Sequence, residues 1–259
     1  MCFLIGVAGD SGTGKSKFAE LLKCSLKEVG HISLDDYHKY SREERKTLGI
    51  TPLNPKANDF KLMYKHLKSI KQGKEIIKPV YDHSRGVIIK DAEHFVPKRV
   101  VIVEGLLPFY YKRLSKLFDL KIFFDISEEL KLRWKIQRDK TQRHYKKEFD
   151  LEQRKVDYVK YVLPQKHICD IIFEVFKESN RDITTKIIIQ HGQLFNVFLK
   201  VPIHKGTVHI TGNEIVLNGR FGKENFFLPK SCVSTINSFT AGQILLIEHL
   251  GKILGEDVS

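Results

Sequence analysis

Short apolar runs recur along the chain, separated by segments with a helical repeat. The runs lie within residues 2–5, 100–103, 121–126 and 170–175, and residues 31–34 are a further plausible short strand. Continuous apolar runs of this length are typical of strands that are buried on both faces of a parallel sheet. Residues 18–26 and 60–67 carry apolar side chains at helical spacing. The alternation predicts an α/β protein whose five-stranded parallel core is covered on both faces.

The pattern changes after a polar link at residues 177–182. Short apolar stretches follow at residues 186–189, 195–201, 208–211 and 214–217. Gly212 and Asn213 are a two-residue hairpin signal. Ile244, Ile247, Leu250 and Leu254 then share one helical face. We expect two parts, residues 1–178 and a small antiparallel β appendage with a closing helix at 183–259. The second part shows no set of residues patterned for catalysis. Its expected roles are dimerisation or shaping the rim of the active site.

Composition favours an anionic partner. The chain has 259 residues, with 44 Lys and Arg against 31 Asp and Glu, and a net charge of +13. This balance suits phosphorylated metabolites or nucleic acid. Since the sequence lacks an RNA-reading signature and zinc-finger spacing, we favour a small phosphorylated molecule over nucleic acid.

The cysteine spacing indicates a reducing compartment. Cys2, Cys24, Cys169 and Cys232 show no pair spacing, which argues against a disulfide framework or a zinc site. The sequence shows no bilayer-length apolar run and no secretory leader. We therefore expect a cytoplasmic protein without a membrane partner.

The first apolar run leads directly into a glycine-rich turn. Its residues are Gly9, Asp10, Ser11, Gly12, Thr13, Gly14, Lys15 and Ser16. Glycine, four residues, then Gly-Lys-Ser, between a strand and a helix, is the phosphate-binding loop pattern. Glycines let backbone N–H groups surround phosphate oxygens, and the following helix directs its positive end at them. Lys15 would reach the β- and γ-phosphates of ATP, and the Ser16 hydroxyl would bind Mg²⁺. This context predicts a P-loop NTPase fold rather than a simple strand-to-helix turn.

Two acidic residues follow predicted strands. Asp35 would lie at the carboxyl end of a strand, the edge of an open α/β sheet where ligands bind. There it could accept a proton from a substrate hydroxyl, although a helix cap or turn is the alternative. Glu104 ends the run 100–103 and would lie beside the phosphate-binding loop. It could hold Mg²⁺ directly or through water, or else form a buried salt bridge.

A basic segment lies between the last two strands of the predicted parallel sheet. Lys131, Arg133, Lys135 and Arg138 belong to a helical pattern at residues 128–139. Basic runs are usually solvated helix faces. In a phosphate-loop protein they also suit a mobile lid that brings guanidinium groups over the transferring phosphoryl group and excludes water. We expect a helical basic lid here.

Together these motifs resemble the phosphoribulokinase branch of the phosphoribulokinase/uridine kinase family. The matching stretches are residues 9–16, 34–38, 55–64, 78–83, 103–108, 134–139 and 164–166. The resemblance spans roughly residues 3–176. Residues 57–60 and 137–139 look like phosphoribulokinase rather than uridine kinase.

The resemblance implies ATP-dependent phosphorylation of the C1 hydroxyl of ribulose 5-phosphate. It implies that Asp35 is the base and lies near the metal with Ser16 and Glu104, and that Lys15 holds the ATP phosphates. The residues implied for the sugar phosphate or the transferring group are His38, Arg42, Tyr81, His83, Arg138 and Arg143. Lys135 and Asp139 would belong to the lid hinge.

Some positions depart from the family pattern. Thr13 stands where the plant-type enzyme has cysteine, so no thiol switch is expected at that position. Asp82 replaces a usual asparagine, and the residues after Arg143 lack the expected glycine. The alternatives are a nucleoside kinase, a kinase of another sugar phosphate, and a non-catalytic nucleotide-binding regulator. A homodimer is compatible with all of them.

Overall fold

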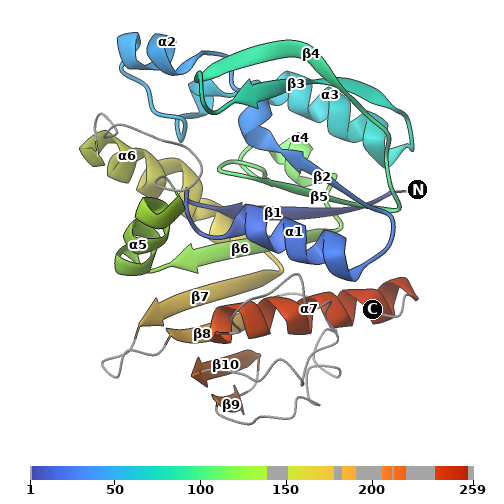
Figure 1. The fold of residues 1–259 in the computed structure, drawn as a ribbon, viewed down its shortest axis with the longest axis vertical. Helices are drawn as coiled ribbons and strands as arrows, with labels where there is room; N and C mark the ends of the chain where they lie inside the picture. Colours follow the sequence, from blue (N-terminus) through green and yellow to red (C-terminus); the bar gives the residue numbers. More distant parts are fainter. Residues whose placement is uncertain are drawn as a thin grey trace.

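The computed structural model describes residues 2–138, 151–177, 183–190, 206–211, 213–219 and 237–255. Its centre is an eight-stranded sheet in the order β2-β5-β1-β6-β7-β8-β10-β9 (Figure 1). The parallel strands are β1 (Phe3–Gly9), β2 (Val29–Ser33), β5 (Val100–Gly105), β6 (Leu120–Ile126) and β7 (Ile171–Lys177). The predicted five-stranded parallel core is confirmed.

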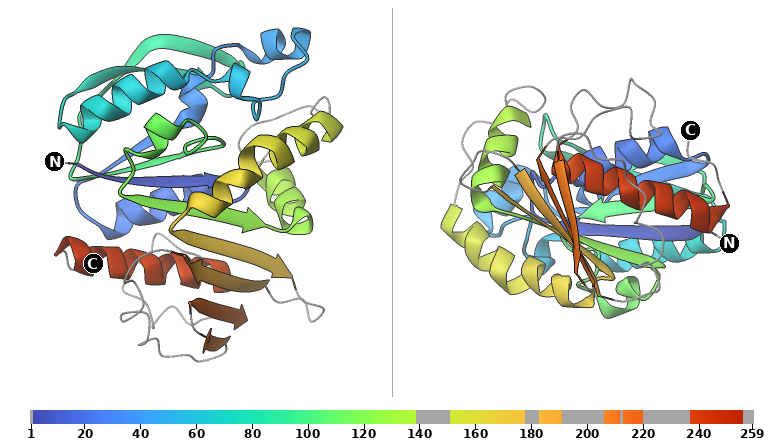
Figure 2. Two further views of the ribbon diagram at one scale, coloured as in Figure 1. Left: turned by 180° about the vertical axis from the view of Figure 1, so that it is seen from behind. Right: turned by 90° about the horizontal axis from the view of Figure 1, so that it is seen from below.

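Helices cover both faces of this sheet. On one face, Ile5 and Val7 pack with helices α1 (Lys15–Ser25) and α7 (Ser238–Leu254). On the other face, Leu4 and Ala8 pack with residues of α3 (Phe60–Lys71) and α4 (Lys112–Ser115). Figure 2 shows these layers from behind and from below. Because alternate residues of β1 enter different cores, the strand is apolar at successive positions.

The C-terminal strands extend the same sheet. β8 (Ile183–Ile189) pairs antiparallel with β7, and β10 (Glu214–Gly219) pairs with both β8 and β9 (Gly206–Thr211). The predicted boundary near residues 178–183 therefore falls between two paired strands. The predicted strand at 195–201 lies outside the described residues.

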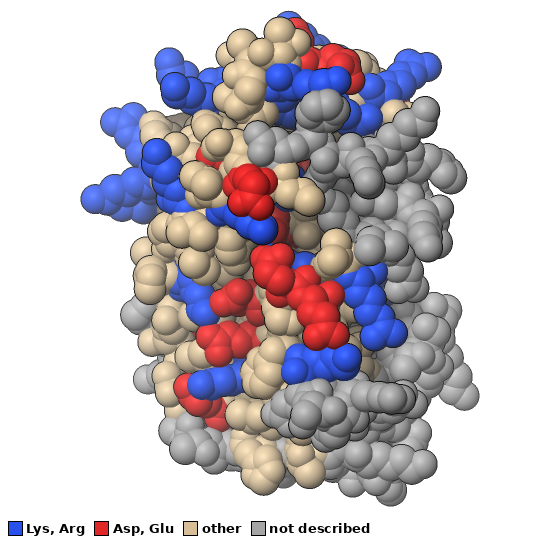
Figure 3. All heavy atoms as spheres, turned by 90° about the vertical axis from the view of Figure 1, so that its left-hand side faces the viewer, with Lys and Arg blue, Asp and Glu red and all other residues tan. Residues whose placement is uncertain are grey.

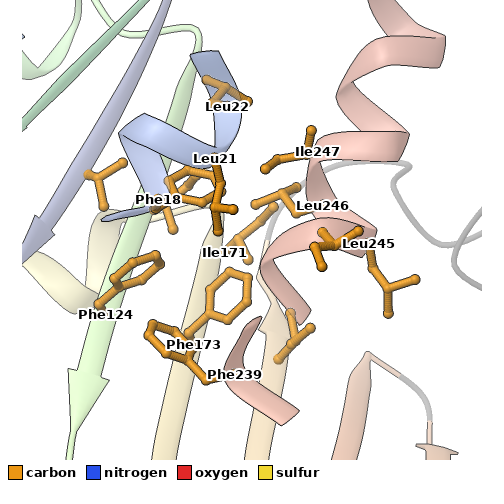
Figure 4. Close-up of a cluster of buried hydrophobic side chains, with 14 of the residues drawn as sticks. Phe18, Leu21, Leu22, Phe124, Ile171, Phe173, Phe239, Leu245, Leu246 and Ile247 are labelled. Atoms are coloured by element: carbon orange, nitrogen blue, oxygen red, sulfur yellow. The ribbon is translucent and has the colours of Figure 1, made fainter. Parts of the chain in front are cut away.

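Helix α7 returns to the N-terminal part of the chain. It packs on β8 and β10 and also contacts α1. Phe239 near its start meets Phe124 of β6 and Phe173 of β7, with ring centroids 5.1 and 6.1 Å apart, respectively. Figure 4 shows these rings beside Phe18 of α1. The predicted closing helix thus completes the core of one face.

Several smaller elements lie near the carboxyl ends of the parallel strands. Between β2 and β5 these are η1 (Leu34–Tyr37), α2 (Arg42–Thr47), η2 (Pro55–Ala57) and the hairpin β3 (Ile76–Asp82) and β4 (Val87–Phe95). Between β6 and β7, α5 (Glu128–Arg138) and α6 (Leu151–Asp157) lie at this edge, and η4 (Tyr158–Val162) and η5 (Leu163–Ile168) lead from it back to the start of β7. The extended segment predicted around residues 78–83 is half of the hairpin. Its partner β4 is mostly exposed, so it lacks the apolar pattern that would have predicted it. Among the described helices, none combines the length and the apolar character that spanning a bilayer requires.

Candidate active site

A cavity of about 1260 Å³ opens where the parallel strands end. Its wall includes the phosphate-binding loop, η1, α2, part of the β3–β4 hairpin, α6 and the start of α7. Ligands of open α/β sheets bind at this edge. The volume exceeds that of a typical site for one small ligand, so two substrates fit within it.

The phosphate-binding loop has the backbone that its glycines permit. Gly14 precedes α1 with a φ of 85°, and Gly9 has a φ of 152°. A Cβ at Gly9 would lie 2.7 Å from the Phe124 carbonyl oxygen, so a larger residue does not fit. Lys15 is buried, and its Nζ donates to the carbonyl oxygens of Gly9 at 3.1 Å and Asp10 at 2.6 Å. The loop thus holds a buried ammonium group at the start of a helix, an arrangement suited to anions.

The Asp10 side chain connects this loop to the helix predicted as the lid, α5, and to the helix that follows it, α6. Its carboxylate pairs with Lys131 of α5 at 3.2 Å and Arg154 of α6 at 3.0 Å, and accepts a hydrogen bond from Ser11 N at 2.7 Å. Burial acts to raise the pKa of Asp10, but Arg154 and Lys131 outweigh it and lower the pKa below its ordinary value. The loop pattern predicts that Asp10 binds ATP and gives no sign of this link, because Arg154 is 144 positions away in the chain.

Two of the predicted metal ligands are adjacent. Ser16 Oγ donates to Glu104 Oε1 at 3.1 Å, and His31 Nε2 lies 3.6 Å from the same oxygen. Hydroxyl and carboxylate oxygens are ligands that Mg²⁺ accepts, usually together with water and phosphate oxygens. In the described part of the chain, no group of three or more His, Cys, Asp or Glu residues forms a metal site. Ser16 and Glu104 therefore fit a metal that a bound nucleotide would help to coordinate.

Asp35 is the second residue of η1, the turn that follows β2. Ser33 caps this turn by accepting a hydrogen bond from Asp35 N, so the capping role considered for Asp35 belongs to Ser33. The Asp35 side chain lines the cavity and is 29% exposed. His38 Nε2 lies 3.9 Å from one of its carboxylate oxygens, and His83 Nε2 lies 3.7 Å from the other. The structure thus brings these three predicted site residues together.

Asp36 has a different environment from its neighbour. It is buried, pairs with Lys78 Nζ at 2.7 Å, and accepts a hydrogen bond from Tyr81 N at 2.9 Å. Burial raises the pKa of Asp36 despite these partners. Asp36 therefore attaches η1 to β3, whereas the Asp35 carboxylate lies in the cavity wall beside His38 and His83.

His38 is held in one tautomer. Its Nδ1 lies 3.1 Å from Asn58 Oδ1, and the Asn58 amide nitrogen donates to Pro52 and Asn54 carbonyls. The Asn58 oxygen is thus an acceptor, so Nδ1 carries the proton and Nε2 presents a lone pair. Burial lowers the pKa of His38 to about 4, so the ring is neutral near pH 7. Its Nε2 can accept a hydrogen bond beside Asp35.

Other residues predicted to bind the sugar phosphate lie in the same region. Arg42 donates from a guanidinium nitrogen to the His83 carbonyl at 2.6 Å. Arg45, one turn later on α2, donates to the Tyr81 hydroxyl at 2.9 Å and lies over its ring. Sequence analysis did not select Arg45. The Ser41-x-x-Glu44 capping box predicts α2 and would have placed both arginines on one helical face.

Part of the predicted lid cannot be compared with the structure. Lys135 and Arg138 belong to α5, but their side chains lie outside the described set, as do Asp139 and Arg143. Cavity residues that sequence analysis missed come from α6 and from around the start of α7. They are Gln153, Arg154, Asn237, Phe239, Thr240 and Gln243. Their sequence offers no phosphate-site or catalytic motif.

Comparison with known proteins gives the family. Residues 4–182 match the model of the phosphoribulokinase/uridine kinase family. The chain belongs to this family.

Both phosphoribulokinases and uridine kinases are similar to the chain. Phosphoribulokinase of Synechocystis sp. is 44% identical over 177 residues, which cover 66% of this chain and 53% of that protein. The chloroplastic phosphoribulokinase of Triticum aestivum is 37% identical over 221 residues, covering 74% and 54% of the two chains. Uridine kinase of Borrelia turicatae is 33% identical over 177 residues, covering 66% and 86%. The chain spans about half the length of these phosphoribulokinases.

A solved member of the family shares the fold along nearly the whole chain. The structure of phosphoribulokinase from Rhodobacter spheroides matches with a TM-score of 0.67 at 18% identity, covering 99% of this chain and 98% of that one. The shared fold therefore includes the C-terminal strands and α7, beyond the residues matched by the family model.

Proposed function

We propose that the protein transfers the γ-phosphoryl group of ATP to the C1 hydroxyl of ribulose 5-phosphate. The observation that carries this proposal is Asp35, exposed between two imidazoles in the cavity that also contains the phosphate-binding loop. Family membership and the phosphoribulokinases named above support the acceptor.

In the proposed reaction, Asp35 acts as the general base. It accepts the proton of the C1 hydroxyl while the hydroxyl oxygen bonds to the γ-phosphorus and ADP departs. The neutral His38 ring would orient the sugar by accepting a hydrogen bond at Nε2 from one of its hydroxyls. A neutral ring suits this task, because an imidazolium could not accept that bond and would favour the ionised carboxylate over its protonated form.

Lys15 and the loop amides would hold the triphosphate. Lys15 would exchange its carbonyl partners for phosphate oxygens, and Ser16 and Glu104 would hold Mg²⁺. Asp35 is a further candidate for that metal. Mg²⁺ would neutralise charge on the phosphate oxygens during transfer.

The phosphate group of ribulose 5-phosphate would bind at the cationic end of the cavity. Arg42 and its neighbours on α2 supply permanent positive charge, and guanidinium groups bind phosphate in a bidentate manner. We propose that His83 and Tyr81 complete this subsite. Lys135, Arg138, Asp139 and Arg143 keep their proposed roles in the lid and at the transferring group.

An acceptor screen tests the function. Purified protein with Mg²⁺ and ATP is offered ribulose 5-phosphate, other pentose phosphates, uridine and cytidine, and ADP formation is measured. We expect the highest kcat/KM with ribulose 5-phosphate. Turnover of uridine or cytidine without ribulose 5-phosphate turnover would establish a nucleoside kinase. Nucleotide binding without turnover of any acceptor would favour a regulator.

A further inference from the structure

The cavity has a second end, at the start of α7, that the proposed chemistry does not use. Thr240 and Gln243 line it from α7, and Asn237 caps that helix. In the sheet, β5 separates β1 from β2, which leads to Asp35, whereas α7 packs on β8 and β10 on the other side of β1. The phosphate-binding loop after β1 therefore lies between Asp35 and α7.

Gln243 carries an unused hydrogen-bond donor at this end. The residue is 2% exposed, and its Nε2 has no hydrogen-bond partner among the described residues. Buried amide groups almost always have partners, because an unpaired one loses its hydration without compensation. Phe239 and Thr240 precede it by four and three positions, so the three residues share one face of α7. An orphaned donor in the wall of a cavity indicates a ligand acceptor.

The same wall provides a flat apolar surface. The rings of Trp134 and Phe239 stack at 12° with centroids 5.7 Å apart. A Cβ on Gly14 would lie 3.1 Å from the Phe239 ring, so this surface adjoins the phosphate-binding loop. A planar group with nitrogen acceptors, attached to a phosphate chain, suits such a surface.

We propose that the start of α7 and Trp134 form the nucleobase subsite, and that Gln243 recognises adenine. This inference rests on the proposed use of a nucleoside triphosphate. A glutamine amide can donate to adenine N7 and accept from its N6 amino group. The same edge of guanine presents two acceptors, O6 and N7, so the amide loses one of the two bonds. Helix α7 lies beyond residues 4–182, so the family match does not assign this subsite.

Ligand binding by the unmodified protein is the first test. Dissociation constants are measured by calorimetry with Mg²⁺ for ATP, GTP, purine riboside triphosphate and inorganic tripolyphosphate. We expect ATP to bind about tenfold more tightly than GTP or the purine analogue, which lacks the N6 amino group. Equal affinities for the three nucleotides would overturn the proposal.

Substitution of Gln243 is the second test. Gln243→Leu keeps a similar volume and removes the amide, so we expect ATP affinity to fall about tenfold. Tripolyphosphate affinity should stay unchanged, because that probe has no base. Gln153→Leu is the matched control, since Gln153 lines the cavity from α6. It should leave the ratio of ATP to GTP affinity unaltered.

Some results would contradict the role of Gln243. If Gln243→Leu lowered the affinities for ATP and tripolyphosphate equally, the substitution would disturb the phosphate site instead. If the variant does not fold, the comparison of nucleotides in the unmodified protein decides. If the protein phosphorylates ribulose 5-phosphate but binds ATP and GTP equally well, the nucleobase subsite is wrong and the proposed function stands. Base discrimination without phosphorylation of any pentose phosphate would defeat only the proposed acceptor.

Discussion

The two ends of the cavity are built in different ways. The end around Asp35 comes from one stretch of chain, residues 33–83, and hydrogen bonds and ion pairs hold its polar side chains. The end at α7 joins Trp134 to residues 237–243 and rests on aromatic packing, in which Phe239 stacks on Trp134 and meets Phe173 edge to face. On the face shown in Figure 3, Lys and Arg side chains gather towards the top, over the region of α2 and the hairpin. The first end is suited to a charged acceptor and to proton transfer, and the second to a flat apolar group.

The largest expected effect tests whether the Asp35 end carries out phosphoryl transfer without contributing to ATP binding. Asp35→Asn should lower kcat by about 10²–10⁴, because the amide cannot accept the hydroxyl proton. The Kd of ATP, measured by calorimetry, should change little. Asp91→Asn is the matched control, since Asp91 is exposed on β4 and asparagine tolerates its positive φ of 46°. A near-normal kcat for Asp35→Asn would make its carboxylate merely structural.

Truncation of Phe239 tests whether packing maintains the α7 end. Phe239→Ala should reduce the free energy of unfolding by about 3–5 kcal/mol, because it leaves a cavity among buried rings. ATP affinity should fall as well, whereas urea unfolding of Phe176→Ala should show a much smaller loss, because Phe176 is partly exposed on β7. Full stability of Phe239→Ala would show that α7 does not depend on this contact.

A pH series tests how the Asp35 end keeps His38 neutral. The pKa of His38 falls from its ordinary value of 6.5 to about 4 in the folded protein. Between these values the unfolded chain binds a proton that the folded chain does not, so stability decreases as pH falls from 6.5 to 4. Across this range His38 changes the free energy of unfolding by about 3 kcal/mol.

The substitution His38→Gln should remove that contribution. Its free energy of unfolding, from urea titrations, should fall less steeply with decreasing pH than that of the unmodified protein. His167→Gln, at an exposed histidine of η5, serves as the control in the same titrations. Identical slopes for His38→Gln and the unmodified protein would show that the ring is not kept neutral.

The smallest expected effect concerns acceptor binding. Arg42→Ala should raise the KM for ribulose 5-phosphate about tenfold, the usual share of a charged hydrogen bond, with kcat less affected. Lys39→Ala, a nearby change outside the cavity wall, serves as the control in the same steady-state assay. If KM stays constant in Arg42→Ala, another cation holds the acceptor phosphate.

Local sequence signals predicted the phosphate-binding loop and parts of the Asp35 end. The glycine pattern at residues 9–16, the strand before Asp35 and the helical spacing at residues 60–67 are each signals within one short segment, and the structure contains all three. The ion pairs of Asp10 could not be predicted in this way. They join residues 144 and 121 positions apart, and no local pattern specifies such partners.

Apolar spacing alone determined the parallel core and the C-terminal helix, because burial on one or both faces imposes a period on the sequence. Tertiary structure decided where that helix would lie. β8 pairs with β7 and carries the sheet onward, so α7 covers the extended face and delivers Phe239 and Gln243 to the phosphate-binding loop. The physical reason is that periodicity states which face of an element is buried, whereas the surface that buries it depends on strand order and packing across the whole chain.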